Sequence, residues 1–318
     1  LQSPGVTLRG ASGNRDTVII DAGPNGIGEA VVVSADDTTI ADLTIRNAPD
    51  HCIHVWGYWD DGVDNILVYN VVLLDADTQL LKVSTDWGGN MASNGEVACS
   101  RISYTTHAPS DYTNGVDVHA GENWVVRDNL FERIRGPGDG YAGPTILMWS
   151  ATVGSVIERN VLVDCFRGIA FGNPSHDFPD HIGGVVRNNF IASDLAGDVS
   201  IEMAYADDFL VAFNTVFTPA TDGSIQSAEA LGGGTNGRFI SNLTSSYIWS
   251  DRDGASAEIA GNVTDASAAF FVAPGSGDLH LTDAAGGALD SGEPVAEVTE
   301  DIDGDTRGGS PDVGADER

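Results

Sequence analysis

Short runs of alternating apolar and polar residues, rich in Val, Ile and Thr, cover most of the chain and are broken by Gly, Asp and Asn. Helical periodicity is scarce, so the pattern predicts many short β-strands and few helices. An Asn that follows a strand-like run and precedes apolar residues recurs at intervals of 31, 29, 25 and 28 residues, at Asn129, Asn160, Asn189, Asn214 and Asn242. A repeat of this length without a helix predicts a parallel β-solenoid, in which each strand pairs with its equivalent one coil away, at roughly 4.8 Å.

The recurrent asparagines predict a ladder within the solenoid. The amide of one Asn can hydrogen-bond to the next, and Asn also tolerates the left-handed backbone of a tight turn. Asn47, Asn70 and Asn262 are expected to extend the series. A β-sandwich is the alternative. Its hairpin signals are weak here, and the intervals exceed the usual spacing of about 8 to 12 residues between its strands.

Seven segments align on a common apolar position, and the alignment predicts which side chains point inward and which outward. The expected inward rows are Ile53, Leu81, Val116, Leu147, Ile169, Ile201 and Ile225, and Val55, Val83, Val118, Trp149, Phe171, Met203 and Ser227. The expected outward rows are His54, Lys82, Asp117, Met148, Ala170, Glu202 and Gln226, and Trp56, Ser84, His119, Ser150, Gly172, Ala204 and Ala228. An apolar interior over seven coils supports this register, because a slip of one residue would expose it.

The first three coils concentrate ionisable side chains on the outward face. Lys82 is the only lysine, against 14 arginines, and it is expected next to Asp117 and close to His119. Strand spacing would place Asp117 about 5 Å from Lys82, and His119 about 7 to 8 Å from it between β-carbons. We therefore predict Lys82, His119 and Asp117 as catalytic residues. The competing interpretation is a solvated strand face, which also alternates apolar and polar residues.

Long segments between the aligned strands are expected to flank this face and to bind substrate, because loops on a rigid scaffold often carry binding residues. Trp56, Trp87 and Tyr141 can stack on sugar rings, although they can equally anchor loops. The predicted substrate-binding residues are His54, Trp56, Trp87, Tyr112, Arg135, Tyr141, Arg167, His176, His181, Arg187 and Glu202.

The formal charge of −32 predicts a protein that does not bind nucleic acid or anionic lipid. No run of 18 apolar residues is present, so no membrane span is expected. The three cysteines match neither a metal site nor a disulfide framework and are expected to be buried thiols. The repeats predict one domain over residues 1–318, with terminal coils and a C-terminal tail folded back along the solenoid after about residue 265.

Two parts of the chain resemble known proteins. The segment Gly5-Val-Thr-Leu-Arg-Gly-Ala-Ser-Gly13, followed by Thr17-Val-Ile-Ile-Asp21, is similar to an early coil of the right-handed parallel β-helix superfamily, which includes pectate lyases. The end, Asp301-Ile-Asp-Gly-Asp305-Thr-Arg307 with Pro311-Asp-Val-Gly-Ala-Asp316, resembles a C-terminal segment of secreted bacterial β-helix proteins. The resemblance implies an extracellular or periplasmic location and a carbohydrate-active enzyme, and a monomer is expected. No signal peptide is seen in the chain, which opens inside a repeat-like segment, so a missing N-terminal part is expected.

For enzymes of this fold, the resemblance implies β-elimination on a uronate-containing polysaccharide, often with calcium. Lys82 would be the base or the group that neutralises the substrate carboxylate, and His119 the base or acid. Asp117 would orient His119 or help to hold a cation. Three alternatives stay open: a C5-epimerase, a glycoside hydrolase and a noncatalytic glycan-binding surface module. The first uses nearly the same groups. A hydrolase needs two carboxyls about 5 to 9.5 Å apart, whereas Asp117 and Glu202 are separated by roughly 14 Å of strand spacings.

A calcium ion is predicted as an optional component rather than a required cofactor. Asp301, Asp303 and Asp305, with Gly304, resemble the start of a calcium loop, but Asp312 stands where an EF-hand would have Glu. A charged, solvated tail is the competing interpretation. The run from His176 to His181 contains two His and two Asp but matches no standard ligand spacing, so a metal is not predicted there.

Overall fold

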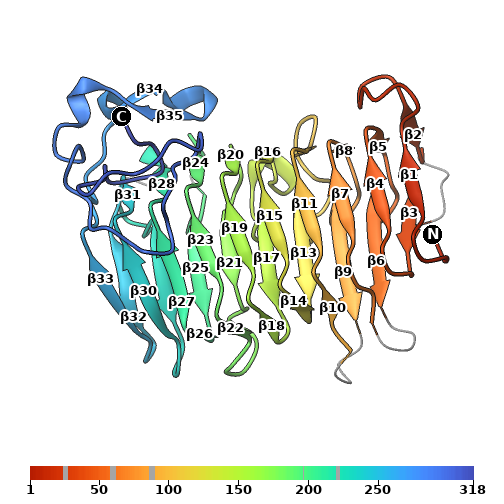
Figure 1. Cartoon of the computed structure of the whole chain (residues 1–318), viewed down its shortest axis with the longest axis horizontal. Coiled ribbons are helices and arrows are strands. Elements are labelled where there is room, and N and C mark those ends of the chain that lie inside the picture. The colour runs from red at the N-terminus through yellow and green to blue at the C-terminus, as the bar shows by residue number, and fades with distance from the viewer. Residues whose placement is uncertain (24–27, 58–61, 86–89, 196, 220–222) are drawn as a thin grey trace.

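The computed structural model describes residues 1–23, 28–57, 62–85, 90–195, 197–219 and 223–318. Short strands stack coil upon coil along one axis, with the N-terminus at one end of the stack (Figure 1). Every strand pairing within the stack is parallel and joins equivalent strands of successive coils, as in the pairing of residues Thr7–Arg9 with Thr39–Ala41. The all-β right-handed parallel β-helix predicted from the repeat is therefore confirmed.

Three long sheets form the walls. Sheet A consists of β1(Thr7–Arg9), β4(Thr39–Ala41), β7(Leu67–Tyr69), β11(Glu96–Ala98), β15(Val125–Arg127), β19(Val156–Glu158), β23(Val185–Arg187), β27(Phe209–Ala212), β30(Asn236–Ile240) and β33(Ser256–Ala260). Sheet B consists of β2(Ile19–Asp21), β5(Thr44–Arg46), β8(Val72–Leu74), β12(Arg101–Ser103), β16(Leu130–Glu132), β20(Val161–Val163), β24(Phe190–Ala192), β28(Thr215–Phe217) and β31(Leu243–Thr244).

Sheet C carries the aligned segments of the sequence. It consists of β3(Val31–Val33), β6(Ile53–Gly57), β9(Leu81–Thr85), β13(Val116–His119), β17(Ile146–Trp149), β21(Ile169–Phe171), β25(Ile201–Ala204), β29(Ala228–Leu231) and β32(Ile248–Arg252). A short fourth sheet consists of β10(Ala92–Ser93), β14(Gly121–Glu122), β18(Thr152–Val153), β22(His181–Ile182) and β26(Ala206–Asp207). One apolar core made of the inward side chains of these sheets runs along the stack.

The asparagine ladder lies at the turn from sheet A to sheet B. Each amide Nδ2 donates to Oδ1 of the Asn one coil further on, at 2.9 to 3.0 Å, through Asn129, Asn160, Asn189, Asn214, Asn242 and Asn262. The ladder satisfies polar groups that the coil stacking buries, so it fixes the register of these coils.

The left-handed residue of each turn is not the ladder Asn but the residue before it, which corrects one detail of the prediction. Asp128, Arg159 and Asn188 have φ values of 58°, 50° and 54°. Asn47 and Asn70 also adopt positive φ, but their amides donate to Asp21 and Asp42 outside the ladder. They therefore do not extend it, whereas Asn262 does.

The C-terminal segment leaves the stack after β33. It contains η3(Ala268–Phe270), β34(Phe271–Ala273), η4(Pro274–Ser276), β35(Asp278–Leu281) and η5(Asp283–Ala285), and another short 3-10 turn, η1(Pro137–Asp139), lies between sheets B and C. Strands β34 and β35 pair antiparallel, so this region forms a hairpin and not the further coil that the sequence predicted.

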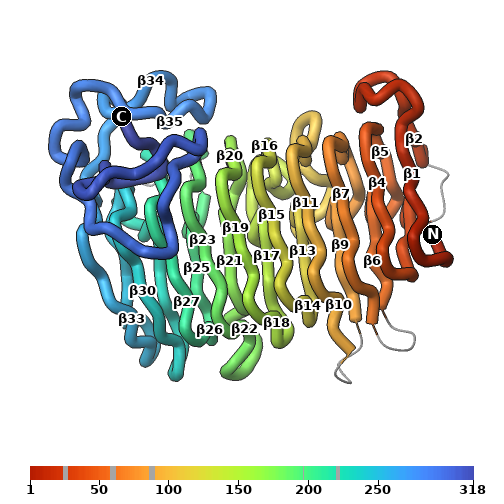
Figure 2. The backbone as a smooth tube through the Cα atoms, viewed as in Figure 1, coloured from red at the N-terminus to blue at the C-terminus, as the bar shows by residue number. Residues whose placement is uncertain are grey.

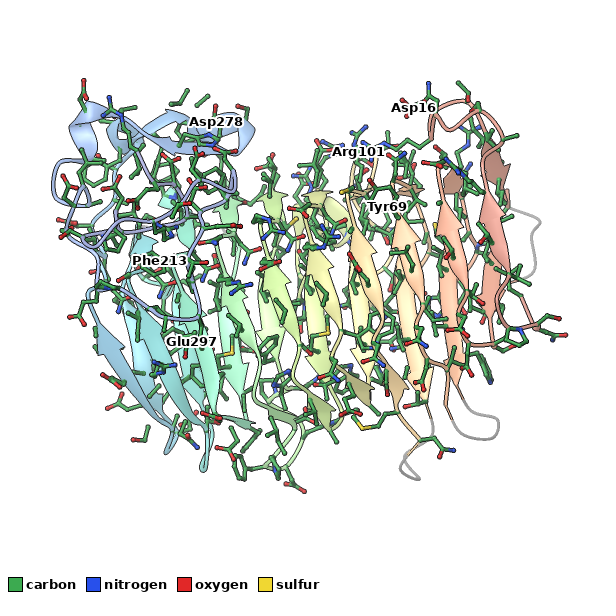
Figure 3. The ribbon with its side chains drawn as sticks, viewed as in Figure 1. Asp16, Tyr69, Arg101, Phe213, Asp278 and Glu297 are labelled. Carbon is green, nitrogen blue, oxygen red and sulfur yellow. The ribbon has the colours of Figure 1, made fainter. Side chains whose placement is uncertain are left out.

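The same segment lies over the side of the C-terminal coils of the solenoid, as the tube view shows (Figure 2). Its apolar residues pack on Phe190 and Phe217 of sheet B. Val295 and Val298 pack near Phe213, which Figure 3 labels. These contacts lie against sheets A and B, whereas the candidate site lies on sheet C. None of the helices that the structure describes is long and apolar enough to cross a membrane.

Candidate active site

The outer face of sheet C carries a column of ionisable residues on neighbouring strands. His54 of β6 pairs with Lys82 of β9, which pairs with Asp117 of β13, as the alignment predicted. The three residues are only 5%, 5% and 2% exposed. A solvated strand face does not bury its charges in this way, so the structure disfavours the competing interpretation of these positions.

Lys82, Asp117, His119 and Trp149 form one connected cluster, which we call the lysine cluster. The Lys82 Nζ donates to Asp117 Oδ2 at 2.5 Å and lies 2.6 Å from His119 Nε2. Asp117 Oδ1 accepts from Trp149 Nε1 at 2.7 Å and lies 3.3 Å from His119 Nε2. Since Nζ and Nε2 are within hydrogen-bond distance, one proton must lie between them, and the ammonium of Lys82 can supply it to the ring nitrogen.

Asp117 holds this cluster through its charge. Burial alone raises the pKa of the Asp117 carboxyl, but the Lys82 ammonium and the His119 ring outweigh burial and lower the pKa to about 2. Asp117 is therefore ionised at neutral pH, and both of its oxygens accept hydrogen bonds from within the cluster. This places Asp117 as the residue that positions Lys82 and Trp149.

Trp149 is a site residue that the sequence alignment missed. Ile146 pairs with Val116, so Leu147 and Trp149 point outward and Met148 points inward, one residue out of the predicted register. The alignment took Trp149 as a core residue because its ring is apolar. The indole N–H needs an acceptor when it is buried, and Asp117 on the neighbouring strand provides one.

Two adjoining cavities open at the lysine cluster. The first has a volume of about 460 Å³ and is lined by Tyr112, Asp117, Tyr141, Trp149, Arg167 and Glu202, among others. The second, of about 530 Å³, is lined by residues that include His119 and His176. Ser175 lines both cavities. The Trp149 ring contacts the His119 and His176 rings, with centroids 4.3 and 4.6 Å away, and so forms part of the wall between the cavities.

A second charged cluster lies further along the same column, and we call it the glutamate cluster. Glu202 of β25 pairs directly with Glu229 of β29, and the two are 5% and 1% exposed. Arg167 donates to Glu202 at 2.7 Å, and Arg252 donates to both oxygens of Glu229 at 3.0 and 2.8 Å.

The last aligned segment was predicted three residues too early, which hid Glu229. The alignment chose Ile225 and Ser227 as inward residues, whereas the structure uses Ala228 and Ala230. Alanine gives a weak apolar signal, and this explains the shift. Gln226 instead donates to Glu229 from outside the strand.

The pKa of Glu202 in the glutamate cluster is raised, whereas that of Asp117 in the lysine cluster is lowered. Burial raises the pKa of Glu202, Arg167 opposes the shift, and the neighbouring Glu229 adds to it, so that the pKa reaches about 7. Two like charges on adjacent strands are costly when both are buried, so one proton is retained near neutral pH. While Glu202 is protonated, the charge of Arg167 is not cancelled by it.

The other predicted binding residues fall into two groups. Tyr112, Tyr141, Arg167, His176 and Glu202 line the cavities. His54 lies on the same face, but it bonds Glu29 at 3.0 Å and Ser84 at 3.1 Å, and burial lowers its pKa. Trp56 packs on His54 with ring centroids 4.9 Å apart. Trp87 lies outside the described residues.

Three predicted binding residues lie outside the linings of both cavities. His181 is fully buried, stacks on Phe171 with centroids 3.9 Å apart, and burial lowers its pKa to about 3, so it is a core residue. Arg187 lies on sheet A, where it bonds Glu158 and the C-terminal segment. Arg135 pairs with Asp139 at 3.0 Å and lines neither cavity. A polar residue type alone could not reveal these tertiary positions.

The predicted calcium loop is folded on itself. Asp301 Oδ1 accepts from the backbone N–H groups of Asp303 and Asp305, and its Oδ2 accepts from that of Glu317. Asp303 instead lies 2.9 Å from the ring nitrogen Nε2 of His280. Since both oxygens of Asp301 have donors, the three aspartates do not present a shared ligand set.

The candidate active site does not fit a calcium ion either, as far as its described residues go. Both oxygens of Asp117 are occupied by Lys82 and Trp149, and Oε2 of Glu202 by Arg167, which leaves Oε1 of Glu202 as one unpartnered oxygen within the part of the chain that the structure describes. Calcium prefers six to eight oxygen ligands with several carboxylates among them. The described residues of this site therefore do not supply the ligand set that calcium needs.

Comparison with known proteins agrees with the fold. No protein-family model matches the sequence, and no curated protein does. Among solved structures, the chain is similar to the crystal structure of pectate lyase Pel9A, with a TM-score of 0.56 and 13% sequence identity. The match covers 98% of this chain and 79% of that one. At this identity the likeness shows a shared β-helix.

Proposed function

We propose that this protein is a polysaccharide lyase that cleaves a uronate-containing glycan by β-elimination at the lysine cluster. The observation that carries the proposal is the buried Lys82–Asp117–His119 arrangement at the junction of two cavities. The fold it shares with a pectate lyase supports a carbohydrate-active role. In this proposal the protein works outside the cytoplasm as a monomer, as expected from the sequence.

His119 is the base in this mechanism. Its side chain is 17% exposed, compared with 7% for Lys82 and 2% for Asp117, and it lines a cavity. In the free protein the ammonium of Lys82 occupies Nε2. When a substrate carboxylate draws the Lys82 ammonium to itself, Nε2 becomes free to take the proton from C5 of the sugar.

The bonding changes balance with these residues alone. The electrons of the C5–H bond form the C4–C5 double bond, and the C4–O4 bond breaks. The proton on His119 then passes to the departing O4, which leaves the ring neutral again. Asp117, 3.3 Å from Nε2, stabilises the imidazolium between the two steps.

Arg167 binds a second carboxylate of the glycan in the first cavity. Its side chain is 11% exposed and lines this cavity together with Trp149, Tyr112 and Tyr141. The tyrosines are 60% and 56% exposed and offer faces for sugar rings. Although the whole chain carries a charge of −32, Arg167 lines this cavity, and Lys82 lies next to it, bonded to the lining residue Asp117.

A glycoside hydrolase is the second candidate, because two acids of opposite pKa shift line the first cavity. The Asp117 pKa is about 2 and the Glu202 pKa about 7, a split typical of a base and an acid. Three strand steps, roughly 14 Å, separate the two residues along the column, and Asp117 is already fully bonded. The lyase therefore ranks first.

The test is incubation with a panel of uronate and neutral polysaccharides, with and without calcium. A lyase produces the ultraviolet absorbance of an unsaturated uronate, and a hydrolase produces reducing ends without it. A C5-epimerase exchanges the C5 proton with D2O without cleavage. Glycan binding without any of these products would show a noncatalytic module and contradict the proposal.

Variants then assign the residues. Lys82→Ala and His119→Gln should each lower the rate at least about 100-fold. Arg101→Gln, at an exposed ion pair on sheet B, is the matched control and should keep wild-type turnover. Wild-type turnover by folded His119→Gln would remove His119 from the mechanism.

A further inference from the structure

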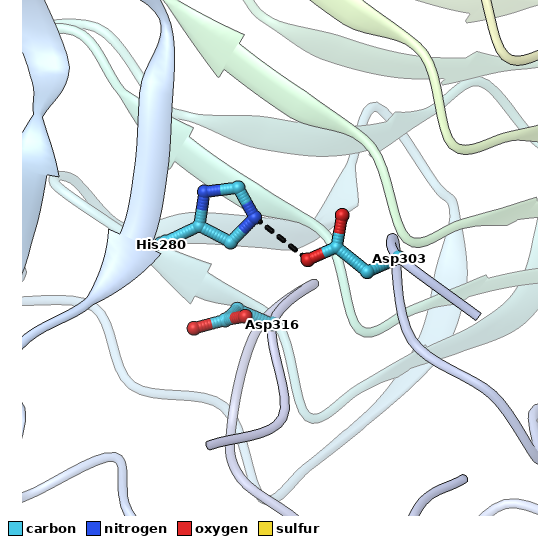
Figure 4. Close-up of side chains that lie close together, drawn as sticks. All are labelled: His280, Asp303 and Asp316. Carbon is cyan, nitrogen blue, oxygen red and sulfur yellow. Dashed lines mark hydrogen bonds and ion pairs between the residues drawn. The ribbon is translucent and has the colours of Figure 1, made fainter. Parts of the chain in front are cut away.

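Three ligand-forming side chains meet where the C-terminal segment packs on the solenoid, far along the chain from the lysine cluster. His280 belongs to β35, and Asp303 and Asp316 belong to the tail (Figure 4). One nitrogen or oxygen of each residue lies within 4.8 Å of those of the other two. The His280 Nε2 lies 2.9 Å from Asp303 Oδ2.

A second carboxylate, that of Asp278, orients the imidazole of His280 on the side away from Asp303. The imidazole Nδ1 lies 2.6 Å from Asp278 Oδ1 and donates to that carboxylate, so that Nε2 faces Asp303. A carboxylate behind a histidine is the arrangement that orients metal-bound histidines in proteins. The lone pair of Nε2 and the Asp303 carboxylate cannot face each other at 2.9 Å unless a proton or a metal cation lies between them.

Asp316 makes a metal the better occupant. It is only 7% exposed, and one oxygen accepts from the backbone N–H of Leu281 at 2.7 Å. The carboxylate also lies beside the imidazole of His280 and the carboxylate of Asp303. A proton between His280 and Asp303 gives the three carboxylates of Asp278, Asp303 and Asp316 only one positive charge, whereas a divalent cation on the neutral ring gives them two.

We propose that His280, Asp303 and Asp316 bind a divalent transition-metal ion, Zn²⁺ or Mn²⁺, that ties the C-terminal tail to the β34–β35 hairpin. One imidazole nitrogen with two carboxylate oxygens suits these ions, whereas calcium prefers oxygen ligands only. A cavity of about 500 Å³ lined by His280 and Asp303 gives the ion and its remaining water ligands access from solvent.

The site would act as a structural clamp. Asp303 and Asp316 lie 23 and 36 residues beyond His280, by subtraction, so the ion closes the tail onto the hairpin without a covalent bond. The hairpin in turn packs on Phe190 and Phe217 of sheet B. Binding only to the folded protein stabilises it by mass action. The site is independent of the proposed lyase activity, which should persist in EDTA.

The test is metal titration of the full chain after EDTA treatment and its removal. Calorimetry with ZnCl₂ and MnCl₂ should show one site per chain, and the melting temperature should rise by about 5 °C at a hundredfold excess over Kd. Asp303→Asn and His280→Gln should each weaken binding at least about tenfold. Asp305→Asn, in the same loop but outside the cluster, is the matched control and should bind as the wild type does.

Other outcomes overturn the proposal. If the wild-type protein binds neither Zn²⁺ nor Mn²⁺ with one ion per chain, the proposal is contradicted directly. This outcome does not depend on whether the variants fold. Wild-type affinity in folded His280→Gln contradicts it as well. Equal loss in Asp303→Asn and Asp305→Asn, with calcium bound best, would show an aspartate loop site instead. The Co²⁺-loaded protein adds a readout, since its visible absorption spectrum should change in His280→Gln and stay unchanged in Asp305→Asn.

Discussion

The lysine cluster and the glutamate cluster lie on the outer face of the same sheet, yet the first lowers the pKa of its buried acid and the second raises it. In the first, an acid pairs in register with an amine, and the pKa of Asp117 falls to about 2 against the effect of burial. In the second, an acid pairs in register with another acid, and burial together with that neighbour raises the pKa of Glu202 to about 7. Ladder geometry is the same in both, so the sign of the neighbour decides the charge state.

The two clusters also differ in the role that each can have on this face of sheet C. In the lysine cluster the Asp117 carboxyl stays ionised, and in the proposed mechanism a proton moves from the substrate to His119 beside Lys82. The glutamate cluster stores a proton and thereby regulates how strongly Arg167 is neutralised. Both clusters line or adjoin the two cavities, so in the lyase proposal one cluster serves as the reaction centre and the other as a separate binding point for the glycan.

The largest expected effect is the loss of Lys82. Lys82→Met leaves the Asp117 carboxylate buried and without its cation, which should lower the free energy of unfolding by about 3 to 5 kcal/mol. Urea denaturation at pH 7 measures the change. The double variant Lys82→Met/Asp117→Leu removes the stranded charge and should recover most of the loss, and a double variant no more stable than the single one would contradict this explanation.

The next largest effect is expected for Glu202→Gln, which should raise the free energy of unfolding by an amount that depends on pH. The Glu202 pKa lies above its unfolded value of 4.5, so its contribution to stability is full below pH 4.5 and is lost as pH rises through about 7. Glu202→Gln cannot lose a proton, so above pH 7 it should be more stable than wild type by up to about 3 kcal/mol, and the gain should vanish near pH 4.5.

Thermal and urea unfolding between pH 4.5 and 8.5 would check this dependence. Glu258→Gln, at an exposed residue of β33, is the matched control and should show no such trend. If Glu202→Gln and wild type differ by the same amount at every pH, Glu202 does not retain its proton, and the contrast between the two clusters is lost.

A smaller effect is expected at the wall between the cavities. Trp149→Phe keeps an aromatic ring but removes the N–H that Asp117 accepts, which should cost about 1 to 2 kcal/mol of stability. If the lyase proposal is right, KM should also change, because Trp149 lines the first cavity. A variant with unchanged stability would show that the Lys82 ammonium alone satisfies Asp117.

The smallest effect calibrates the others. Arg101, which Figure 3 labels, pairs with Glu132 on sheet B. The two side chains are 2.6 Å apart, but that of Arg101 is 42% exposed. Arg101→Gln should change the free energy of unfolding by less than about 0.5 kcal/mol, because water and salt screen an exposed pair. A loss comparable with that of Lys82→Met would mean that pairing, and not burial, sets the size of these effects.

Much of the fold could be read from the sequence. The spacing of Asn129, Asn160 and Asn189 predicted the coil length, and the apolar rows predicted the side of each strand that faces the core in the first three coils. The column of His54, Lys82 and Asp117 followed from that register, because parallel strands bring equivalent residues together. Prediction weakened where the apolar signal was ambiguous, at Trp149, or faint, at Ala228 and Ala230.

The sequence by itself determined the solenoid and the first half of the candidate site, since both depend on a repeat that local patterning encodes. Only the tertiary structure decided that His181 lies in the core, that Arg187 hydrogen-bonds to the C-terminal segment, and that Asp303 contacts His280. Those contacts join residues of different turns and of the separate tail. Their spacing along the chain carries no periodic signal, so packing and charge in the folded state alone bring them together.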